Sequence, residues 1–359
     1  MNTVFKDLKV IELASVLAGP AVGMFFAELG ATVIKVENKT TNGDVTRNWR
    51  LAKEDQDRNY SAYYCSVNWQ KKTLFYDLRQ ATDYQQLLAL IKTADVVISN
   101  YRAASAKKMK LDYAQLKRAN PKLIYAELSG FGRTSTRAAF DIVLQAEAGF
   151  LYMTGDPKGE IARLPVALID LMAAHQLKEG ILIALLERYK TGKGSYLHVS
   201  LLEAALASLA NQATNWLMEA HIPTRMGCLH PNIAPYGEIF LSKDNKMMVL
   251  AIGTEKQFVE LCRCLGATEL ATNPLFRTNQ ERVKNRNALK EKLKDLVVQF
   301  ERKTLLTAFH ESGVPAGSIR NMEEVFELDL AQEMILTEKM EDGTISKRLK
   351  TVAFTRIED

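Results

Sequence analysis

The sequence LKVIELASVLAGPAVGMFFAELGATVIKV, residues 8–36, decides the fold class. Residues 8–13 are a β-rich run, and Ala18-Gly19-Pro20 then opens an apolar helix that ends near Gly30. Proline in the first turn of a helix and glycine just past its last turn are typical boundaries. Residues 32–36 are a second β-rich run, so the stretch predicts a strand, a helix and a second, parallel strand.

The same alternation continues through the first half of the chain. Further short apolar runs, expected to be strands, lie at residues 73–76, 95–98, 123–126 and 196–199. Helical stretches separate them at residues 81–93, 102–118 and 171–190. The pattern predicts an α/β fold whose Rossmann-like parallel sheet is covered by helices on both faces.

A proline-rich break divides the chain. After a helix expected at 201–220, Pro223, Pro231 and Pro235 precede a second set of elements. These are a strand expected at 247–252 and helices expected at about 254–265 and 285–300. We therefore expect a large domain over residues 1–200, a linker over 201–224, a smaller α+β domain over 225–325 and a return segment over 326–359.

Composition excludes several classes of protein. The chain has 359 residues, of which 47% are hydrophobic and 25% charged, and no apolar run is long enough to span a bilayer. Its first residues lack the features of a signal peptide. The four cysteines form no C-x-x-C motif and the five histidines show no paired spacing, so we expect a reduced, cytoplasmic protein without a metal site.

Positive charge is concentrated in one part of the chain. The net charge is +5, but residues 71–122 contain eleven Lys and Arg against four Asp. One interpretation is a solvated surface, and another is a site for a small polyanion such as a phosphorylated cofactor. No nucleic-acid-binding motif accompanies the stretch, so a nucleic-acid partner is not expected.

The turn after the first strand argues against a dinucleotide. Glu37 ends the second strand, where such proteins hold a ribose hydroxyl. However, the turn at residues 15–20 has one glycine, whereas the G-x-G-x-x-G fingerprint needs three for a pyrophosphate to lie on the backbone. The sequence therefore predicts a Rossmann-like sheet without NAD or FAD.

A series of motifs runs in a fixed order through most of the chain. They are A-G-P at 18–20, A-E-L-G-A-T-V-I-K-V-E at 27–37, G-D-V-T-R at 43–47, N-W-Q-K-K-T at 68–73, A-D-V-V-I-S-N-Y-R at 94–102, N-P-K-L-I-Y at 120–125, S-G-F-G at 129–132, F-D-I-V-L-Q-A at 140–146, T-G-K-G at 191–194, H-P-N-I-A-P-Y at 230–236 and G-V-P-A-G at 313–317. In this order and spacing, the chain resembles CoA-transferase family III, the CaiB/BaiF family.

The resemblance implies an activity and a site. It implies an acyl-CoA:carboxylate CoA-transferase that works through mixed anhydrides and an aspartyl-CoA thioester, with coenzyme A as substrate and no tightly bound cofactor. Asp170 would be the nucleophile, and the pantetheine channel would be lined by Val16, Leu17 and Ala18. The expected contacts of the CoA phosphates and adenine are Lys39, Lys71, Lys72, Asn100, Arg102 and Lys108. The resemblance also implies an interlocked homodimer, with no nucleic-acid or membrane partner.

The residues around Asp170 allow a second interpretation. Asp170 follows the apolar run 166–169 and precedes a helix expected from Leu171, so by itself it resembles a helix N-cap. Both roles are compatible, because a helix N-terminus stabilises an anion. The ordinary pKa of Asp, about 3.9, predicts an ionised carboxylate at neutral pH.

Two other functions stay open. A related α-methylacyl-CoA racemase would need a second proton-transfer group, but Phe140 stands where that branch has histidine, and we expect His175 to be a packing residue. A non-catalytic acyl-CoA-binding subunit would use the same basic stretch, with Asp170 acting only as a cap.

The chain also departs from the family pattern at two places. It ends at Asp359, before the family's L-G-E-H-T motif and final helix. The loop at residues 228–235 has no glycine where formyl-CoA transferases carry a glycine-rich loop, which does not favour oxalate or formate as substrates. Arg133, Arg137 and Arg163 are candidates to contact a substrate carboxylate.

Overall fold

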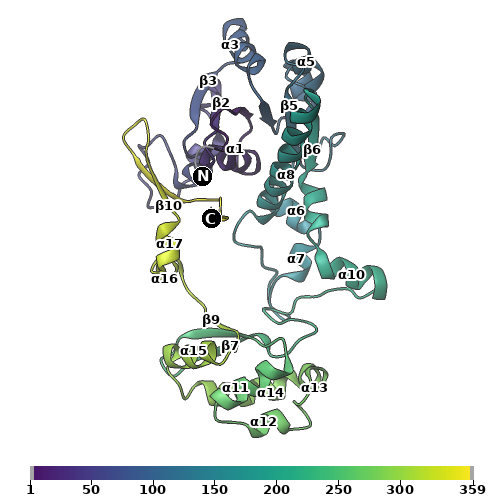
Figure 1. Cartoon of the computed structure of the whole chain (residues 1–359), viewed down its shortest axis with the longest axis vertical. Helices are drawn as coiled ribbons and strands as arrows, with labels where there is room; N and C mark the ends of the chain where they lie inside the picture. Colours follow the sequence, from purple (N-terminus) through teal and green to yellow (C-terminus); the bar gives the residue numbers. More distant parts are fainter. Residues whose placement is uncertain (1–3, 356–359) are drawn as a thin grey trace. The chain divides into compact units, whose positions relative to one another are not determined.

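The structure is a computed structural model that describes residues 4–355. The chain forms two compact units, shown together in Figure 1. Unit 1 contains the chain up to Leu151, the segment Arg163–Pro223 and the chain from Leu330 onward. Unit 2 contains Tyr152–Ala162 and Thr224–Asp329. The segment Tyr152–Ala162, expected in the large domain, therefore belongs to the smaller unit.

Unit 1 is built on a six-stranded sheet in which every strand pair is parallel. The strands are β1 Lys9–Leu13, β2 Thr32–Asn38, β3 Lys72–Tyr76, β4 Val96–Ser99, β5 Ile124–Ser129 and β6 Tyr196–Ser200. Their order is β3-β2-β1-β4-β5-β6, which is the Rossmann order. The predicted parallel α/β sheet is confirmed.

Two hydrophobic cores cover the two faces of this sheet. Val10 of β1 packs in one core with α1 (Ala18–Glu28) and α8 (Leu168–Thr191). Its neighbour Ile11 points to the other face and packs in a core with α3 (Ala81–Lys92). Because both faces are buried, the central strands are continuous apolar runs and easily identified from sequence.

Three helices differ from expectation. The helix expected at 102–118 is divided into α4 (Ala103–Lys108) and α5 (Tyr113–Ala119), because Lys110 has a left-handed φ of 56° and Asp112 caps α5. The expected linker helix is divided into α9 (Leu201–Ala207) and α10 (Ala210–Glu219). Because α9 packs against α8 and buries Ala204 and Ala205, it is part of unit 1 rather than a linker. Finally, α8 begins at Leu168, three residues before the expected start.

Shorter elements complete unit 1. Between β2 and β3 lie the 3-10 turns η1 (Lys39–Thr41) and η2 (Val45–Asn48) and the helix α2 (Ala62–Cys65). The helices α6 (Asp141–Glu147) and α7 (Phe150–Met153) precede α8. The returning chain forms α17 (Asp329–Glu333) and the hairpin β10 (Ile335–Lys339) and β11 (Ile345–Leu349). Its Thr351 N–H donates at 2.8 Å to the buried carboxylate of Glu28 on α1.

Unit 2 has a three-stranded antiparallel sheet in the order β7-β8-β9. Its elements are β7 Tyr236–Leu241, β8 Met247–Ala251, α11 Glu255–Cys264, α12 Glu269–Thr272, α13 Asn279–Lys284, α14 Arg286–Val297, α15 Arg302–Glu311, β9 Ala316–Ser318 and α16 Met322–Val325. A separate core, centred on Phe258, Leu293 and Phe309, holds the helices to the sheet. Within residues 4–355, no helix is both long and apolar enough to cross a membrane.

The glycine-free loop before β7 is held firmly within unit 2. Asn279 accepts a hydrogen bond from the Ala234 N–H at 3.2 Å, and Arg282 donates to the Ala234 carbonyl at 2.8 Å. Arg286 donates to the carbonyl of His230 at 2.6 Å. These side chains fix the backbone of a loop that lacks glycine hinges.

Candidate active site

A cavity of about 250 Å³ opens beside the carboxyl ends of β1, β4 and β5 in unit 1. Its lining comes from residues 15–18 after β1, 100–103 after β4, 127–130 at the end of β5, and the loop before α6. In a sheet of this order, ligands bind where the strand order reverses, and here that point lies between β1 and β4. The cavity therefore lies where the topology predicts a ligand site.

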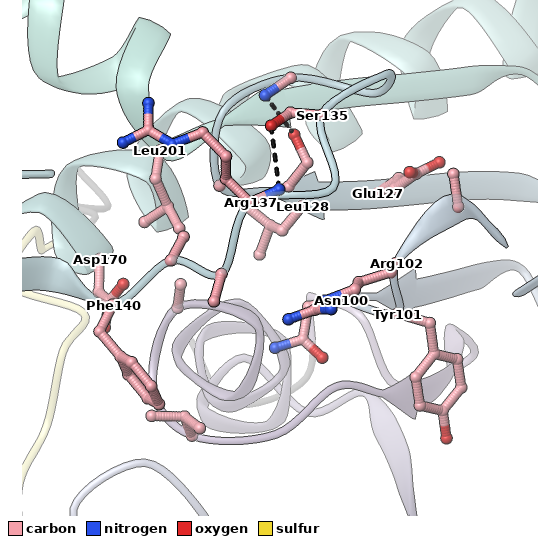
Figure 2. A pocket seen from close by; sticks show the side chains of 18 of the residues that line it. Asn100, Tyr101, Arg102, Glu127, Leu128, Ser135, Arg137, Phe140, Asp170 and Leu201 are labelled. Atoms are coloured by element: carbon pink, nitrogen blue, oxygen red, sulfur yellow. Dashed lines mark hydrogen bonds between the residues drawn. The ribbon is translucent and has the colours of Figure 1, made fainter. Parts of the chain in front are cut away.

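The cavity collects most of the residues expected at the site. Those that line it are Val16, Leu17, Ala18, Asn100, Arg102 and Asp170. Figure 2 shows Asp170 and Phe140 at one end, well separated from Asn100, Tyr101 and Arg102. Of the two carboxylates in the lining, Asp170 lies at one end, and Glu127 lies on the side of Tyr101 and Arg102.

Asp170 lies in the first turn of α8 but does not cap it. Asp170 is buried, with 8% of the residue exposed. The acceptor for the helix N-terminus is instead Asp141, whose Oδ1 accepts from the Ile169 N–H at 2.7 Å and the Asp170 N–H at 3.3 Å. The N-cap interpretation of Asp170 is therefore wrong, because α8 begins earlier and Asp141 provides the capping oxygen. Among residues 4–355, no side-chain partner holds the Asp170 carboxylate.

Burial changes the ionisation expected for Asp170. Burial, reinforced by the negative charge of Asp141, raises the pKa of Asp170 from its ordinary value to about 7. The helix N-terminus favours the anion, but loss of water around the carboxylate outweighs that effect. At neutral pH, the Asp170 carboxylate is therefore expected to be partly protonated rather than fully ionised.

Asn100 and Lys71 have protein partners that limit their expected roles. The Asn100 amide accepts from the Ser15 N–H at 3.2 Å and donates to the Ser15 carbonyl at 2.9 Å, so it holds the turn after β1. The Lys71 ammonium is buried and donates to Glu12 at 2.7 Å, to the Pro20 carbonyl and to Asn68. The Lys71 ammonium is therefore not available to a phosphate, contrary to expectation, because three protein acceptors already surround it.

The other expected cations lie outside this cavity. Lys39 is exposed in η1, Lys72 is exposed on β3, and Lys108 is exposed at the end of α4. Exposed ammonium groups are free to meet a phosphate, but their positions alone do not assign them that role.

A second cavity, of about 280 Å³, lies beside the carboxyl ends of β2 and β3. Its walls include Tyr76, Leu78, Arg79 and Met109, and it shares Tyr101 with the first cavity. Its lining also includes Glu37 and Asp77, and Asp77 forms an ion pair with the Arg79 guanidinium. The aromatic and apolar side chains suit a flat base. These residues were not expected from the sequence, although Tyr76, Leu78 and Arg79 end or follow an expected strand; Met109 follows α4.

Two of the three candidate carboxylate-binding arginines line the first cavity. Arg133 lies over the ring of Tyr196, at 4.7 Å from its centroid, and Tyr196 donates to Glu127. Arg137 lies over the Phe131 ring and forms an exposed ion pair with Glu147. Arg163 is exposed and is not part of the lining.

Neither of the two positions considered for a racemase, 140 and 175, places a proton-transfer group in the cavity. Phe140 lines the cavity next to Asp170. His175 is exposed on α8 and does not line it, so the expected packing role of His175 is also wrong. A racemase would need a proton donor and acceptor on opposite faces of the substrate.

Sequence and structure comparisons agree on the class of protein. Residues 5–357 match CoA-transferase family III, and the chain belongs to that family. It is a CoA-transferase, which acts on CoA thioesters.

Three relatives illustrate the match. The chain is 36% identical over 352 residues to the succinate–glutarate CoA-transferase of Agrobacterium fabrum, covering 96% of this chain and 87% of that protein. It is 35% identical over 328 residues to the acetyl-CoA:oxalate CoA-transferase of Acetobacter aceti, covering 90% and 82%. A crystal structure of a CaiB/BaiF family protein from Brucella suis superposes with a TM-score of 0.85 at 36% identity, covering 100% and 94%.

Proposed function

We propose that this enzyme transfers CoA between two carboxylic acids through a covalent aspartyl-CoA thioester at Asp170. The observation that carries the proposal is the buried carboxylate of Asp170 at the end of the cavity, with no side-chain partner in the described chain. Glu127, the other carboxylate in the lining, accepts a hydrogen bond from Tyr196. Covalent trapping of the Asp170 thioester with hydroxylamine tests the proposal.

The reaction proceeds in four acyl substitutions. A carboxylate oxygen of Asp170 attacks the donor thioester carbonyl, the carbon–sulfur bond breaks, and a mixed anhydride and CoA thiolate form. The thiolate attacks the aspartyl carbonyl, which forms the aspartyl-CoA thioester and releases the donor acid as a carboxylate. The acceptor carboxylate then attacks this thioester to give a second mixed anhydride and CoA thiolate. Finally, the thiolate attacks the acceptor acyl carbon and regenerates the Asp170 carboxylate, so the cycle needs no net proton.

Each substitution places negative charge on a carbonyl oxygen. The first turn of α1 offers N–H groups without intrahelical acceptors at Leu17, Ala18 and Gly19. Leu17 and Ala18 line the cavity that contains Asp170. Backbone donors in a site with little water are effective in stabilising such an oxyanion, and we assign them that role.

We assign the two ends of CoA to the two cavities. We place adenine in the second cavity, against Tyr76 and Met109, and pantetheine along residues 16–18 toward Asp170. Tyr101, which lines both cavities, marks the passage between them. Arg102, which lines the first cavity, and Arg79, which lines the second and whose ion pair with Asp77 is exposed, are then the phosphate contacts, with Lys39, Lys72 and Lys108 as further candidates.

The Arg102→Ala enzyme is expected to bind CoA about fivefold more weakly, which corresponds to about 1 kcal/mol for a partly exposed ion pair. The difference should shrink as salt is added, because exposed charges are screened. Calorimetry at low and high salt measures both effects. Lys107→Ala is the matched control, because Lys107 is exposed on α4 but does not line either cavity. Equal affinities in the two variants would remove Arg102 from the CoA site.

We further propose dicarboxylic acids as the substrates. Two relatives are named for succinate and glutarate and for oxalate, all of which carry a second carboxylate. Arg137 is the group best placed to bind it, because its ion pair with Glu147 is exposed and can exchange for a substrate carboxylate. Arg133, by contrast, lies over Tyr196, which is bonded to Glu127.

A homodimer is the proposed assembly. On the second half of α8, Ile183, Leu186 and Tyr189 form an exposed apolar row, with Tyr189 93% exposed. On α10, Trp216 and Leu217 are exposed as well. Clustered, exposed apolar side chains of this kind mark interaction surfaces. The family resemblance adds that the two chains interlock, which suits a chain that leaves unit 1 after Pro223 and returns at Leu330.

Sedimentation is expected to find twice the chain mass at every concentration down to nanomolar, because an obligate interface buries a large apolar area. The Leu186→Glu variant should weaken the dimer, since a charge replaces an exposed apolar side chain on α8. Leu275→Glu, at an exposed position in unit 2, is the matched control. A stable, active monomer of the native enzyme contradicts the proposal.

The cytoplasmic location and the expectation of no nucleic-acid or membrane partner stay predictions. All four cysteines (Cys65, Cys228, Cys262 and Cys264) are free thiols, which suits a reducing compartment.

A further inference from the structure

Val16, in the turn between β1 and α1, has an unusual backbone conformation. Its φ is +72°, in the left-handed region, where a β-branched residue is a genuine outlier. Such strain persists only where surrounding groups enforce it, and it is concentrated at functional sites. Val16 lines the cavity that contains Asp170, so the position of the strain calls for a functional explanation.

Three side chains hold the backbone on both sides of the strained residue. The Lys35 ammonium donates to the Ala14 carbonyl at 2.8 Å. Asn100 holds both the N–H and the carbonyl of Ser15. Asp44 accepts from the Val16 N–H, at 3.3 Å to Oδ1 and 3.2 Å to Oδ2. The turn is thus fixed by residues that come from β2, from the start of η2 and from the end of β4.

We call Lys35, Asp44 and Asn100, which hold this turn, the clamp. The charged side chains of the clamp are buried and paired. Lys35 lies 3.0 Å from Glu12 and 3.0 Å from Asp44, and all three side chains are completely buried. Lys71 provides a second cation for Glu12. Gly23 on α1 makes room for the group, because a Cβ there would lie 1.9 Å from the Glu12 carboxylate. Removing one partner from such a buried ion group would leave an uncompensated buried charge, so the group holds the turn firmly.

The clamp stays charged near neutral pH. Burial pulls the pKa of Lys35 downward, but Glu12 and Asp44 carry it above the ordinary value. Burial likewise opposes ionisation of Asp44, yet Lys35 and the Thr46 N–H hold the pKa of Asp44 below its usual range. The carboxylate that accepts the Val16 N–H therefore remains an anion.

We propose that Asp44 and Lys35 are positioning residues that hold Val16 in its left-handed conformation and so aim the first turn of α1 at Asp170. The Val16 N–H donates to Asp44. The next two residues, Leu17 and Ala18, line the cavity, and their N–H groups remain available to a substrate oxygen. This inference rests on the proposed aspartyl-CoA chemistry. It predicts that the clamp controls the rate of the acyl substitution rather than the affinity for CoA.

A double-mutant cycle between Asp44 and Val16 tests the proposal. Glycine adopts positive φ without strain, so Val16→Gly makes the turn independent of the clamp. The variants are Asp44→Asn, Val16→Gly and the two together. For each, we would measure the single-turnover rate of covalent CoA attachment, the KM for acyl-CoA and the melting temperature.

We expect Asp44→Asn to lower the single-turnover rate about 30-fold at saturating acyl-CoA, with KM changed by less than about threefold. Val16→Gly should stay within about threefold of the native rate, and the double variant should recover to within about fivefold. Asp112→Asn is the matched control, because Asp112 caps α5 and lines neither cavity; asparagine caps a helix as well as aspartate does, so this variant should keep the native rate. If Asp44→Asn does not fold, Asn100→Ser replaces it in the cycle, with the same recovery expected.

Two outcomes overturn the proposal: a native single-turnover rate in the folded Asp44→Asn enzyme, or losses that multiply in the double variant. Both differ from failure of the proposed function, in which the native enzyme itself forms no adduct at Asp170. A melting temperature that falls without a change in rate assigns the clamp a purely structural role.

Discussion

The Asp170→Asn enzyme is expected to lose CoA transfer by about 10⁴-fold or more. An amide cannot form the mixed anhydride, and within the cavity no neighbouring carboxylate is free to replace it, because Glu127 is bonded to Tyr196. Steady-state transfer between an acyl-CoA and a free acid measures the effect. Asp156→Asn is a matched control, since Asp156 lies in unit 2 and does not line the cavity. Retention of a tenth of the native rate by Asp170→Asn would falsify the covalent mechanism.

The same variant should be more stable than the native enzyme at pH 8. The pKa of Asp170 is raised to about 7 in the folded state, whereas its unfolded value is about 3.9. The folded protein therefore binds more protons than the unfolded chain between these values, and its stability falls as pH rises through this window. Asp170→Asn removes this titration, so its stability advantage should grow by about 1–3 kcal/mol between pH 5 and pH 8. Thermal melting at the two pH values measures the change and shows that lost activity is not lost folding.

Replacement of Arg137 is expected to change substrate selectivity. Arg137→Gln should raise the KM for glutarate or succinate about tenfold, which corresponds to about 1.4 kcal/mol for a charge-assisted contact that is partly exposed. Butyrate, which lacks the second carboxylate, should be unaffected. The ratio of kcat/KM for glutarate and butyrate as CoA acceptors measures the effect.

Glu147→Gln provides the opposite control for Arg137. It removes the partner that competes for the guanidinium, so the KM for dicarboxylates should fall or stay unchanged. Arg133→Gln should leave the selectivity ratio near its native value, because Arg133 lies over Tyr196. A ratio that is unchanged in Arg137→Gln assigns recognition of the second carboxylate to another group.

Most of the fold of unit 1 could be predicted because its strands are buried on both faces. Runs such as Val96-Val97-Ile98 contain no polar break, and the strands lie within one or two residues of their expected bounds except at the end of β5, which extends three residues further. The breaks in the helices were missed because no glycine or proline marks them. The left-handed turn at Lys110 is made by a residue type with no preference for that conformation. The sequence signal for a new helix was Asp112, a residue type that often caps helices and that caps α5.

The site was less predictable, because its electrostatics depend on tertiary partners. Asp141 is 29 residues before Asp170, and nothing in the local sequence of Asp170 shows that a second carboxylate and burial raise its pKa. Lys71 was expected at a phosphate because it lies in a basic stretch, but its partner Glu12 is 59 residues away on β1. Local charge patterns cannot distinguish a solvent-facing cation from one that is paired inside the core.

The most direct test of the covalent mechanism is mass spectrometry of the peptide that contains Asp170. The native enzyme would be mixed with acyl-CoA without an acceptor acid, treated with hydroxylamine and digested. A thioester or anhydride at Asp170 reacts with hydroxylamine, so a hydroxamate should appear at Asp170 and be absent from the Asp170→Asn control. An enzyme that transfers CoA at its full rate while the Asp170 peptide remains unmodified would contradict the mechanism.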